Sequence, residues 1–433
     1  MSARVLLLAD GGCNTGFGVV THSIFERLVR DYQHDVHVLA TNFRGDTWPS
    51  ILDPTQPTNL RLYRPTMYDP SDLYGRTRIV ELLGKIEPDV VVMINDPKII
   101  LNFLFDNPHD TVPTIDGEAK HLLLRYRPIL SYVPCDGINL PPKWTEVLPR
   151  VTKMLAYSKW CQQVYASPDR DPLDIVYHGV DTDTFYPVSR QHPIHLEGTD
   201  TVLTTKRECK RAFRFDPDGF LVLRVDSNSG RKDYPASYKA LVPFMDEHKD
   251  VQVHFHGAAT NSQSGVDLAA MWSRTPQFKP GERWFVPGLH EGFEGWPVSH
   301  LAALHNAADV FLSTSRGEGF GLNLVNSLAC GVPVIAQNVS AIPEVVGPGG
   351  ILIEPDRLIT VPAGEDTWLA DIPAFTKALE KMYRSKGLRR DLGNAGRAHV
   401  VQSFSWDAAA AKFHHHIEAL AARSEERRVG KQC

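Results

Sequence analysis

Two groups of residues in the second half of the sequence have side chains suited to a phosphate-bearing ligand. The first, Gly317-Glu-Gly-Phe-Gly321, follows the apolar run Val310–Ser313 and leads into a helical pattern. Small residues at such a turn let backbone N–H groups approach an anion, and the dipole of the following helix favours negative charge there. Glu318 adds a hydrogen-bond acceptor to the same turn. Its alternative role is that of a carboxylate stabilising a helix start.

The second group is a pair of cations, Arg231 and Lys232, which follows the apolar run Phe220–Val225 and a polar turn. Cations at this place would offset the negative charge that grows on a phosphate leaving group. Taken alone, the pair would be interpreted as a solvated loop feature.

The first half of the sequence offers two more candidates. Gly16-Phe17-Gly18 lies between an apolar run and a helical pattern, as a phosphate-facing glycine loop or a plain turn would. Asp136 follows the apolar run Ile129–Val133. It could orient a substrate hydroxyl or stabilise positive charge at a reacting carbon. It could equally be a turn aspartate before Gly137.

Short apolar runs that alternate with helix-length segments predict the scaffold for these residues. Continuous Val/Ile/Leu runs are typical of parallel strands buried on both faces, which indicates an α/β fold with two doubly wound, Rossmann-like domains. We predict domains at 1–190 and 206–402, a linker at 191–205, a terminal helix at 403–424 and a frayed tail at 425–433. The expected strands are Val5–Ala9, His37–Ala40, Val90–Ile94, Ile129–Val133, Met154–Tyr157, Ile175–Tyr177, Phe220–Val225, Val251–His256, Trp284–Val286, Val310–Ser313, Val332–Ala336 and Gly350–Ile353.

Composition excludes several classes of protein. The 433 residues carry a net charge of −5, with 42% hydrophobic and 22% charged residues, which is ordinary globular composition and not that of a basic nucleic-acid module. The start, MSARVLLLADGG, fits a buried strand better than a signal peptide. Six scattered cysteines without CxxC spacing indicate reduced thiols and a cytoplasmic location. No metal site is expected, because the consecutive His414–His416 would point in different directions on a helix.

The sequence resembles the family-4 retaining glycosyltransferases of GT-B architecture. The signature is the glutamate followed by Gly-Phe-Gly at Glu318–Gly321, supported by segments that match the family along the chain: Ile175–Pro187, Ala307–Ser313, Ile342–Gly347 and Phe404–Trp406. The resemblance implies two Rossmann-like domains facing a central cleft, with the C-terminal helix crossing back to the first domain. It also implies metal-independent transfer of a hexose from a nucleotide-diphosphate sugar, with UDP the expected nucleotide, to a hydroxyl acceptor, and no other cofactor.

The resemblance assigns a role to each candidate. Glu318 would bind hydroxyls of the donor sugar. The residues expected at the donor diphosphate are Gly16, Phe17, Gly18, Arg231, Lys232, Gly319, Phe320, Gly321 and Leu322. Asp136, Lys232 and Glu318 are the expected catalytic residues.

Three positions depart from the family pattern. Asn326 stands where a second glutamate should bind the donor ribose, so donor affinity or nucleotide preference would differ. Ser227 replaces an arginine that binds the diphosphate, and Arg231 or Arg224 would substitute for it. Asp136 replaces an active-site histidine.

These departures leave a second hypothesis, a non-catalytic protein that binds a nucleotide sugar. The acceptor is not identified by the sequence, and nor is the oligomeric state. Aromatic and basic residues interleave at Arg61–Tyr68 and Tyr74–Arg78, which makes a hydroxymethylated base in DNA a minority option; the alternative is a solvated loop.

Overall fold

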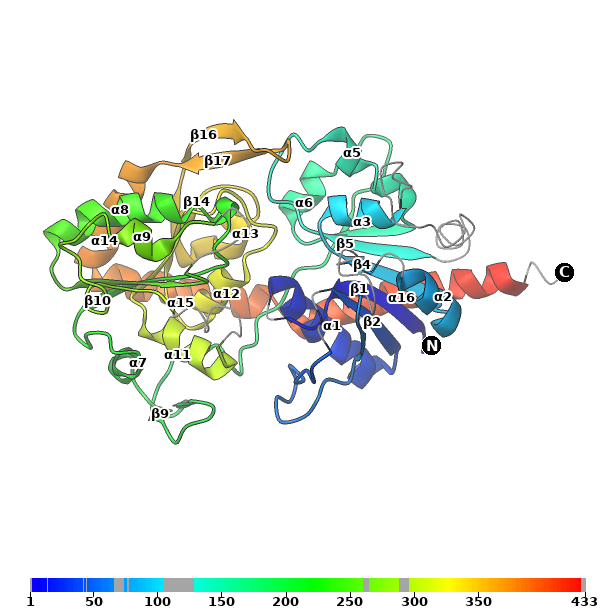
Figure 1. The fold of residues 1–433 in the computed structure, drawn as a ribbon, viewed down its shortest axis with the longest axis horizontal. Coiled ribbons are helices and arrows are strands. Elements are labelled where there is room, and N and C mark those ends of the chain that lie inside the picture. The colour runs from blue at the N-terminus through cyan, green and yellow to red at the C-terminus, as the bar shows by residue number, and fades with distance from the viewer. Residues whose placement is uncertain are drawn as a thin grey trace. The chain divides into compact units, whose positions relative to one another are not determined.

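The apolar runs form two parallel sheets, one in each of two units of the chain (Figure 1). The computed structural model describes residues 2–13, 15–41, 43, 45–65, 74–75, 78–104, 128–259, 265–287 and 296–429. The first unit comprises Met1–Cys135, Leu140–Gly179 and Trp406–Cys433, and the second comprises Asp136–Asn139 and Val180–Ser405.

The first unit contains a seven-stranded sheet of order β3-β2-β1-β4-β5-β6-β7, in which all neighbours pair in parallel. The central strands are buried because helices of the unit cover the sheet. The strands are β1 (Arg4–Asp10), β2 (Asp35–Thr41), β3 (Arg61–Tyr63), β4 (Val90–Ile94), β5 (Ile129–Val133), β6 (Lys153–Ala156) and β7 (Asp174–Ile175).

The helices of the first unit include the last helix of the chain. They are α1 (Gly16–Tyr32), α2 (Arg78–Ile86), α3 (Pro97–Leu104), α5 (Pro142–Thr145), the 3-10 helix η1 (Leu148–Arg150), α6 (Lys159–Val164) and α16 (Trp406–Val429). α16 packs on α1: the rings of Phe25 and Phe413 meet edge to face at 5.5 Å, and Arg27 pairs with Asp407 at 2.6 Å. The predicted return of the C-terminal helix to the first domain is therefore confirmed.

The second unit contains a six-stranded parallel sheet of order β12-β11-β10-β13-β14-β15. Its strands are β10 (Phe220–Val225), β11 (Val251–His256), β12 (Trp284–Phe285), β13 (Val310–Ser313), β14 (Val334–Gln337) and β15 (Gly350–Ile353). In both sheets the chain starts near the middle, builds outward and then reverses direction, as in a doubly wound nucleotide-binding fold. The two Rossmann-like sheets are as predicted.

Helices and two small hairpins complete the second unit. The helices are α7 (Lys206–Ala212), η2 (Gly230–Lys232), α8 (Tyr234–Glu247), α9 (Leu268–Trp272), α11 (Val298–Ala307), α12 (Leu322–Ala329), α13 (Ile342–Val346), η3 (Gly347–Gly349), α14 (Ile372–Arg384) and α15 (Lys386–Ser403). One hairpin joins β8 (Ile194–His195) to β9 (Val202–Leu203), and the other joins β16 (Pro355–Thr360) to β17 (Asp366–Ala370).

The limits of the two units differ from the predicted domain limits. The first unit ends at Gly179, and the segment predicted as a linker, 191–205, forms the β8–β9 hairpin inside the second unit. Gly198 turns that hairpin with φ +73°, a conformation that glycine adopts at no steric cost. α16 begins at Trp406 and continues to Val429, because residues 425–428 are strong helix formers. The end of the predicted tail, 430–433, lies outside the described residues.

Candidate functional site

The loops that follow β10 and β13 lie side by side, because the two strands are parallel neighbours in the sheet. The chain order reverses between these strands, and ligands of doubly wound folds bind beyond the carboxyl ends of strands at such a point. After β10 the chain forms η2 and then α8, whose first turn is capped by the Asp233 side chain at the Ala236 N–H. The loop after β13 carries Glu318 and leads into α12.

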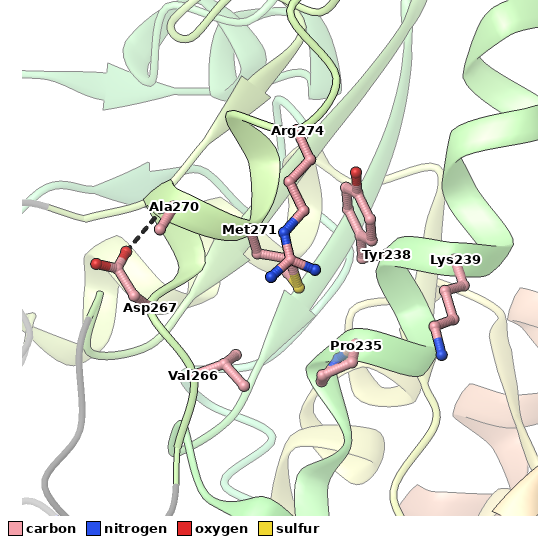
Figure 2. A pocket seen from close by; sticks show the side chains of 8 residues that line it. All are labelled: Pro235, Tyr238, Lys239, Val266, Asp267, Ala270, Met271 and Arg274. Carbon is pink, nitrogen blue, oxygen red and sulfur yellow. Dashed lines mark hydrogen bonds between the residues drawn. The ribbon is translucent and has the colours of Figure 1, made fainter.

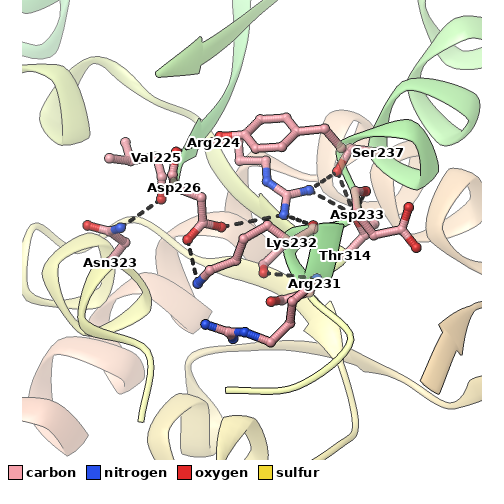
Figure 3. A network of polar contacts seen from close by, with 12 residues as sticks. Arg224, Val225, Asp226, Arg231, Lys232, Asp233, Ser237, Thr314 and Asn323 are labelled. Carbon is pink, nitrogen blue, oxygen red and sulfur yellow. Dashed lines mark hydrogen bonds and ion pairs between the residues drawn. The ribbon is translucent and has the colours of Figure 1, made fainter. Parts of the chain in front are cut away.

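The structure brings the predicted cations into direct contact with Glu318. Lys232 Nζ lies 2.6 Å from Glu318 Oε1 and 2.8 Å from Asp226 Oδ1. Arg231 Nη1 lies 3.0 Å from Glu318 Oε2, and Arg231 Nε lies 3.1 Å from Asp136 Oδ2. We call Asp136, Asp226, Arg231, Lys232 and Glu318 the charged cluster; Figure 3 shows three of its members, Asp226, Arg231 and Lys232.

Glu318 is ionised and firmly held. Its residue is 6% exposed, Ser315 Oγ donates to its carboxylate at 2.6 Å, and its own N–H donates to Ser340 Oγ at 2.8 Å. Burial alone would raise the pKa of Glu318, but the charges of Lys232 and Arg231, with hydrogen bonds from Lys232 and Ser315, lower it from 4.5 to about 2. The carboxylate is therefore a pure hydrogen-bond acceptor at neutral pH.

Arg224 supports the loop from the interior of the second unit. Its side chain is fully buried and stacks on the Tyr234 ring, with 4.2 Å from Cζ to the ring centroid. Its Nη1 donates to Ser237 and Thr314, and its Nη2 donates to the Lys232 carbonyl (Figure 3). Of the two arginines considered as substitutes for the family arginine, Arg231 is the one that reaches the surface, with a 34% exposed side chain. Ser227 is exposed on the same loop.

The glycine-rich turn presents backbone donors at the start of α12. Gly321 adopts φ +102°, and α12 begins at Leu322 without a side-chain cap. Among the described residues, the N–H groups of Gly319, Gly321 and Leu322 donate to no other group. The ring of Phe320 is buried and packs edge to face on Phe404 at 5.0 Å, which anchors the turn. A helix N-terminus with unsatisfied donors is suited to an anion.

The backbone around Asp136 is fixed by β17. Ile138 and Asp366 exchange two backbone hydrogen bonds of 2.9 Å, and Asn139 donates to the Asp366 carboxylate at 2.8 Å. A Cβ atom at Gly317 would overlap the Asp136 carbonyl, so only glycine allows this approach. Asp226 within the cluster, and Ser315 and Ser340 beside it, were not predicted. A polar residue one or two positions after a buried strand, as at Asp226 and Ser315, is the signal that could have found two of them.

Other predicted residues are not members of the charged cluster. Asn326 is half-buried on α12, one turn beyond Leu322 on the same face, and its side chain bonds to no other described residue. Gly16, Phe17 and Gly18 form the first turn of α1 in the first unit, where Thr15 caps the helix at the Gly18 N–H. Of the basic and aromatic stretches, residues 66–68 and 76–77 lie outside the described residues.

Two cavities open in the second unit near α8. One of about 270 Å³ is lined by Asn228, Ser229, Gly230, Asp233, Tyr234, Pro235, Gly265, Val266 and Arg316. The other, of about 300 Å³, has an apolar floor of Tyr238 and Met271 with Lys239 and Arg274 at its rim (Figure 2). Elsewhere among the described residues, Glu247, His248 and Glu380 place possible metal-ligand atoms within 4.8 Å of one another, although His248 and Glu380 already pair directly at 2.6 Å.

Comparison with known proteins supports the resemblance found in the sequence. Residues 293–399 match the family described as Glycosyl transferases group 1. D-inositol 3-phosphate glycosyltransferase of Segniliparus rotundus is 32% identical over 254 residues, which cover 57% of this chain and 46% of that protein. The chain spans about half or less of the length of the curated relatives that it matches first.

Solved structures share the fold over nearly the whole chain. Sucrose-phosphate synthase of Thermosynechococcus elongatus matches with a TM-score of 0.69 and 17% identity over 97% of this chain and 100% of that one. Anabaena HepE in complex with UDP-glucose matches with a TM-score of 0.67 and 15% identity over 96% and 100% of the two chains. These structures confirm the GT-B fold, and the group 1 match over residues 293–399 supports the resemblance to family-4 glycosyltransferases. Among the described residues, no helix has the length and apolar character needed to cross a membrane.

Proposed function

We propose that this protein is a retaining glycosyltransferase that moves a hexose from a UDP-linked donor to a hydroxyl group. The observation that carries the proposal is the charged cluster itself: Lys232, Arg231 and an ionised Glu318 meet beside the open N-terminus of α12. A sugar diphosphate offers the complementary groups, namely an anion for the cations and N–H donors and hydroxyls for the carboxylate. The relatives that act as glycosyltransferases support the same reaction class.

In the proposed reaction the diphosphate replaces Glu318 as a partner of Lys232 and Arg231. Both cations and the N–H groups of Gly319 and Leu322 then stabilise the charge that grows on the leaving nucleoside diphosphate. Glu318 accepts hydrogen bonds from sugar hydroxyls and fixes the ring for attack. The departing phosphate oxygen takes the proton of the acceptor hydroxyl on the face that it leaves, so the α configuration is retained.

We propose that the reaction needs no metal ion, since protein cations and a helix N-terminus supply the positive charge that the leaving group requires. Asn326 lies one turn further along α12, and we assign it to the donor ribose. UDP is proposed because HepE, which has the same fold, was solved with UDP-glucose. A cytoplasmic location is proposed because the six cysteines are scattered along the sequence without CxxC spacing, which is typical of proteins that do not depend on disulfides.

The second candidate is a protein that binds a nucleotide sugar without turning it over. The departures at Ser227, Asn326 and Asp136 favour it, whereas the intact contacts of Lys232 and Glu318 favour the enzyme. One experiment separates the two: the protein is incubated with a panel of nucleotide sugars and acceptors, including hydroxymethylated DNA, and the products are identified by mass spectrometry. Transfer or donor hydrolysis that is absent from Lys232→Ala supports the enzyme. Binding of UDP-glucose with no turnover against any acceptor would establish the binding protein instead.

A further inference from the structure

The Nε and Nη1 atoms of the Arg231 guanidinium contact neighbouring residues of the second unit, whereas its Nη2 atom is available to a ligand. Its Nε forms an ion pair with Asp136 Oδ2 at 3.1 Å, and its Nη1 donates to the Gly317 carbonyl and to Glu318 Oε2. Among the described residues, Nη2 has no hydrogen-bond partner, and about a third of the side chain is exposed. An arginine fixed in this way presents one set of N–H donors to a ligand in a set orientation.

Asp136 is itself immobilised by backbone contacts that do not involve Arg231. The exchange of hydrogen bonds between Ile138 and Asp366 joins its segment to β17, and its carbonyl lies against Gly317. Its carboxylate is therefore a fixed anchor, whereas the long arginine side chain would otherwise sample many rotamers. Glu318 also holds Arg231, through Oε2, but in the proposed reaction its carboxylate accepts hydrogen bonds from the sugar hydroxyls, so Asp136 is the anchor that remains for Arg231.

We infer that Asp136 is a positioning residue that fixes Arg231 as the second diphosphate-binding cation, and that it does not act on the sugar. This inference rests on the proposed function and deepens it, since it explains how a chain with Ser227 in place of the family arginine supplies that cation. Arg231 binds the diphosphate in the proposed geometry only while Asp136 holds its side chain in place. Loss of Asp136 should therefore weaken binding of the nucleoside diphosphate even when no sugar is present.

The test is a double-mutant cycle read by isothermal titration with UDP, together with kcat and KM for UDP-glucose. Asp136→Ala should weaken UDP binding about tenfold or more, the scale for one hydrogen bond to a charged group. Asp136→Asn should recover only part of that loss, because its amide oxygen can still face the guanidinium but lacks the negative charge of the ion pair. Arg231→Gln should weaken binding at least as much as Asp136→Ala. The double variant Asp136→Ala/Arg231→Gln should be no weaker than Arg231→Gln alone.

The matched control is Asp391→Ala, which removes an exposed carboxylate that pairs with Arg390 on α15; it should leave UDP binding unchanged. Thermal unfolding of each variant reports whether the fold is intact, and Asp136→Asn provides the same comparison if the alanine variant is unstable. Additive effects of the two substitutions would overturn the inference. So would a lower kcat for Asp136→Ala with unchanged UDP affinity, which would place Asp136 at the sugar. A wild-type protein that binds no UDP overturns the proposed function and this inference together.

Discussion

Replacement of Lys232 by methionine tests the charged cluster most directly. The Lys232 ammonium lies between two carboxylates at 2.6 and 2.8 Å, and the Glu318 and Asp226 residues are only 6% and 9% exposed. Removing one partner of a buried ion pair leaves an uncompensated charge, which costs about 3–5 kcal/mol. Arg231 and Arg224 still face these carboxylates, so we expect a loss near the lower end, about 3 kcal/mol. Loss of a cation at the leaving group should also reduce turnover by about two to three orders of magnitude.

The double variant Lys232→Met/Glu318→Gln separates the two effects. A neutral glutamine needs no counter-charge, so the double variant should regain much of the lost stability, while turnover stays as low as in Lys232→Met. Stability is followed by urea unfolding at pH 7, and turnover by mass spectrometry of the products. Near-wild-type turnover of Lys232→Met would refute the phosphate role of Lys232. Recovery of turnover in the double variant would show that the single variant had failed through misfolding.

Four further outcomes are expected. The pKa of Glu318 is lowered from 4.5 to about 2, so its ionisation stabilises the fold fully above about pH 4.5 and less as the pH falls toward 2. The difference in stability between wild type and Glu318→Gln, measured by thermal unfolding, should narrow over that range, and a constant difference would contradict the assignment. In titration calorimetry, a donor without ribose hydroxyls should bind wild type more weakly than the parent donor does. Asn326→Ala should erase most of this difference in affinity, and an unchanged difference would show that Asn326 does not contact the ribose. An α-linked donor should give an α-linked product by NMR of the anomeric proton, whereas a β-linked product would overturn the mechanism. Transfer should persist in excess EDTA, and a loss restored by a divalent cation would show that the reaction needs a metal.

The strands could be predicted where burial on both faces makes the sequence continuously apolar. Val90–Ile94, Phe220–Val225 and Val251–His256 were predicted with the bounds that the structure shows. The β16–β17 hairpin was missed, because Asp356-Arg357 and Asp366-Thr367 lack a long apolar run, and the hairpin lies outside the large parallel sheet. That omission matters for the site, since β17 holds the segment that carries Asp136.

The contacts within the site were predictable in part. The sequence predicted that Lys232 and Glu318 each follow a strand. It did not predict that these strands, β10 and β13, are neighbours, because strand order depends on the packing of the whole sheet. The two candidate arginines also looked equivalent in sequence. Arg224 stands between apolar residues in β10, and its side chain is completely buried. Arg231 lies after the strand, and part of its side chain is exposed. Burial, which follows from packing and not from residue type, separates their roles.

The balance of charge explains why the cluster fits a sugar diphosphate better than a simple anion. Without a ligand, Lys232 and Arg231 are paired with Glu318, Asp226 and Asp136, so each ionised group already has an opposite charge beside it. An anion that captured both cations would leave the buried Glu318 carboxylate with fewer partners, at a cost in free energy. Sugar hydroxyls attached to the same anion replace those lost hydrogen bonds on Glu318. A ligand that joins a diphosphate to hydroxyls would therefore offer partners to both the cations and Glu318, and this is the physical ground for the proposal that the site binds a nucleotide sugar.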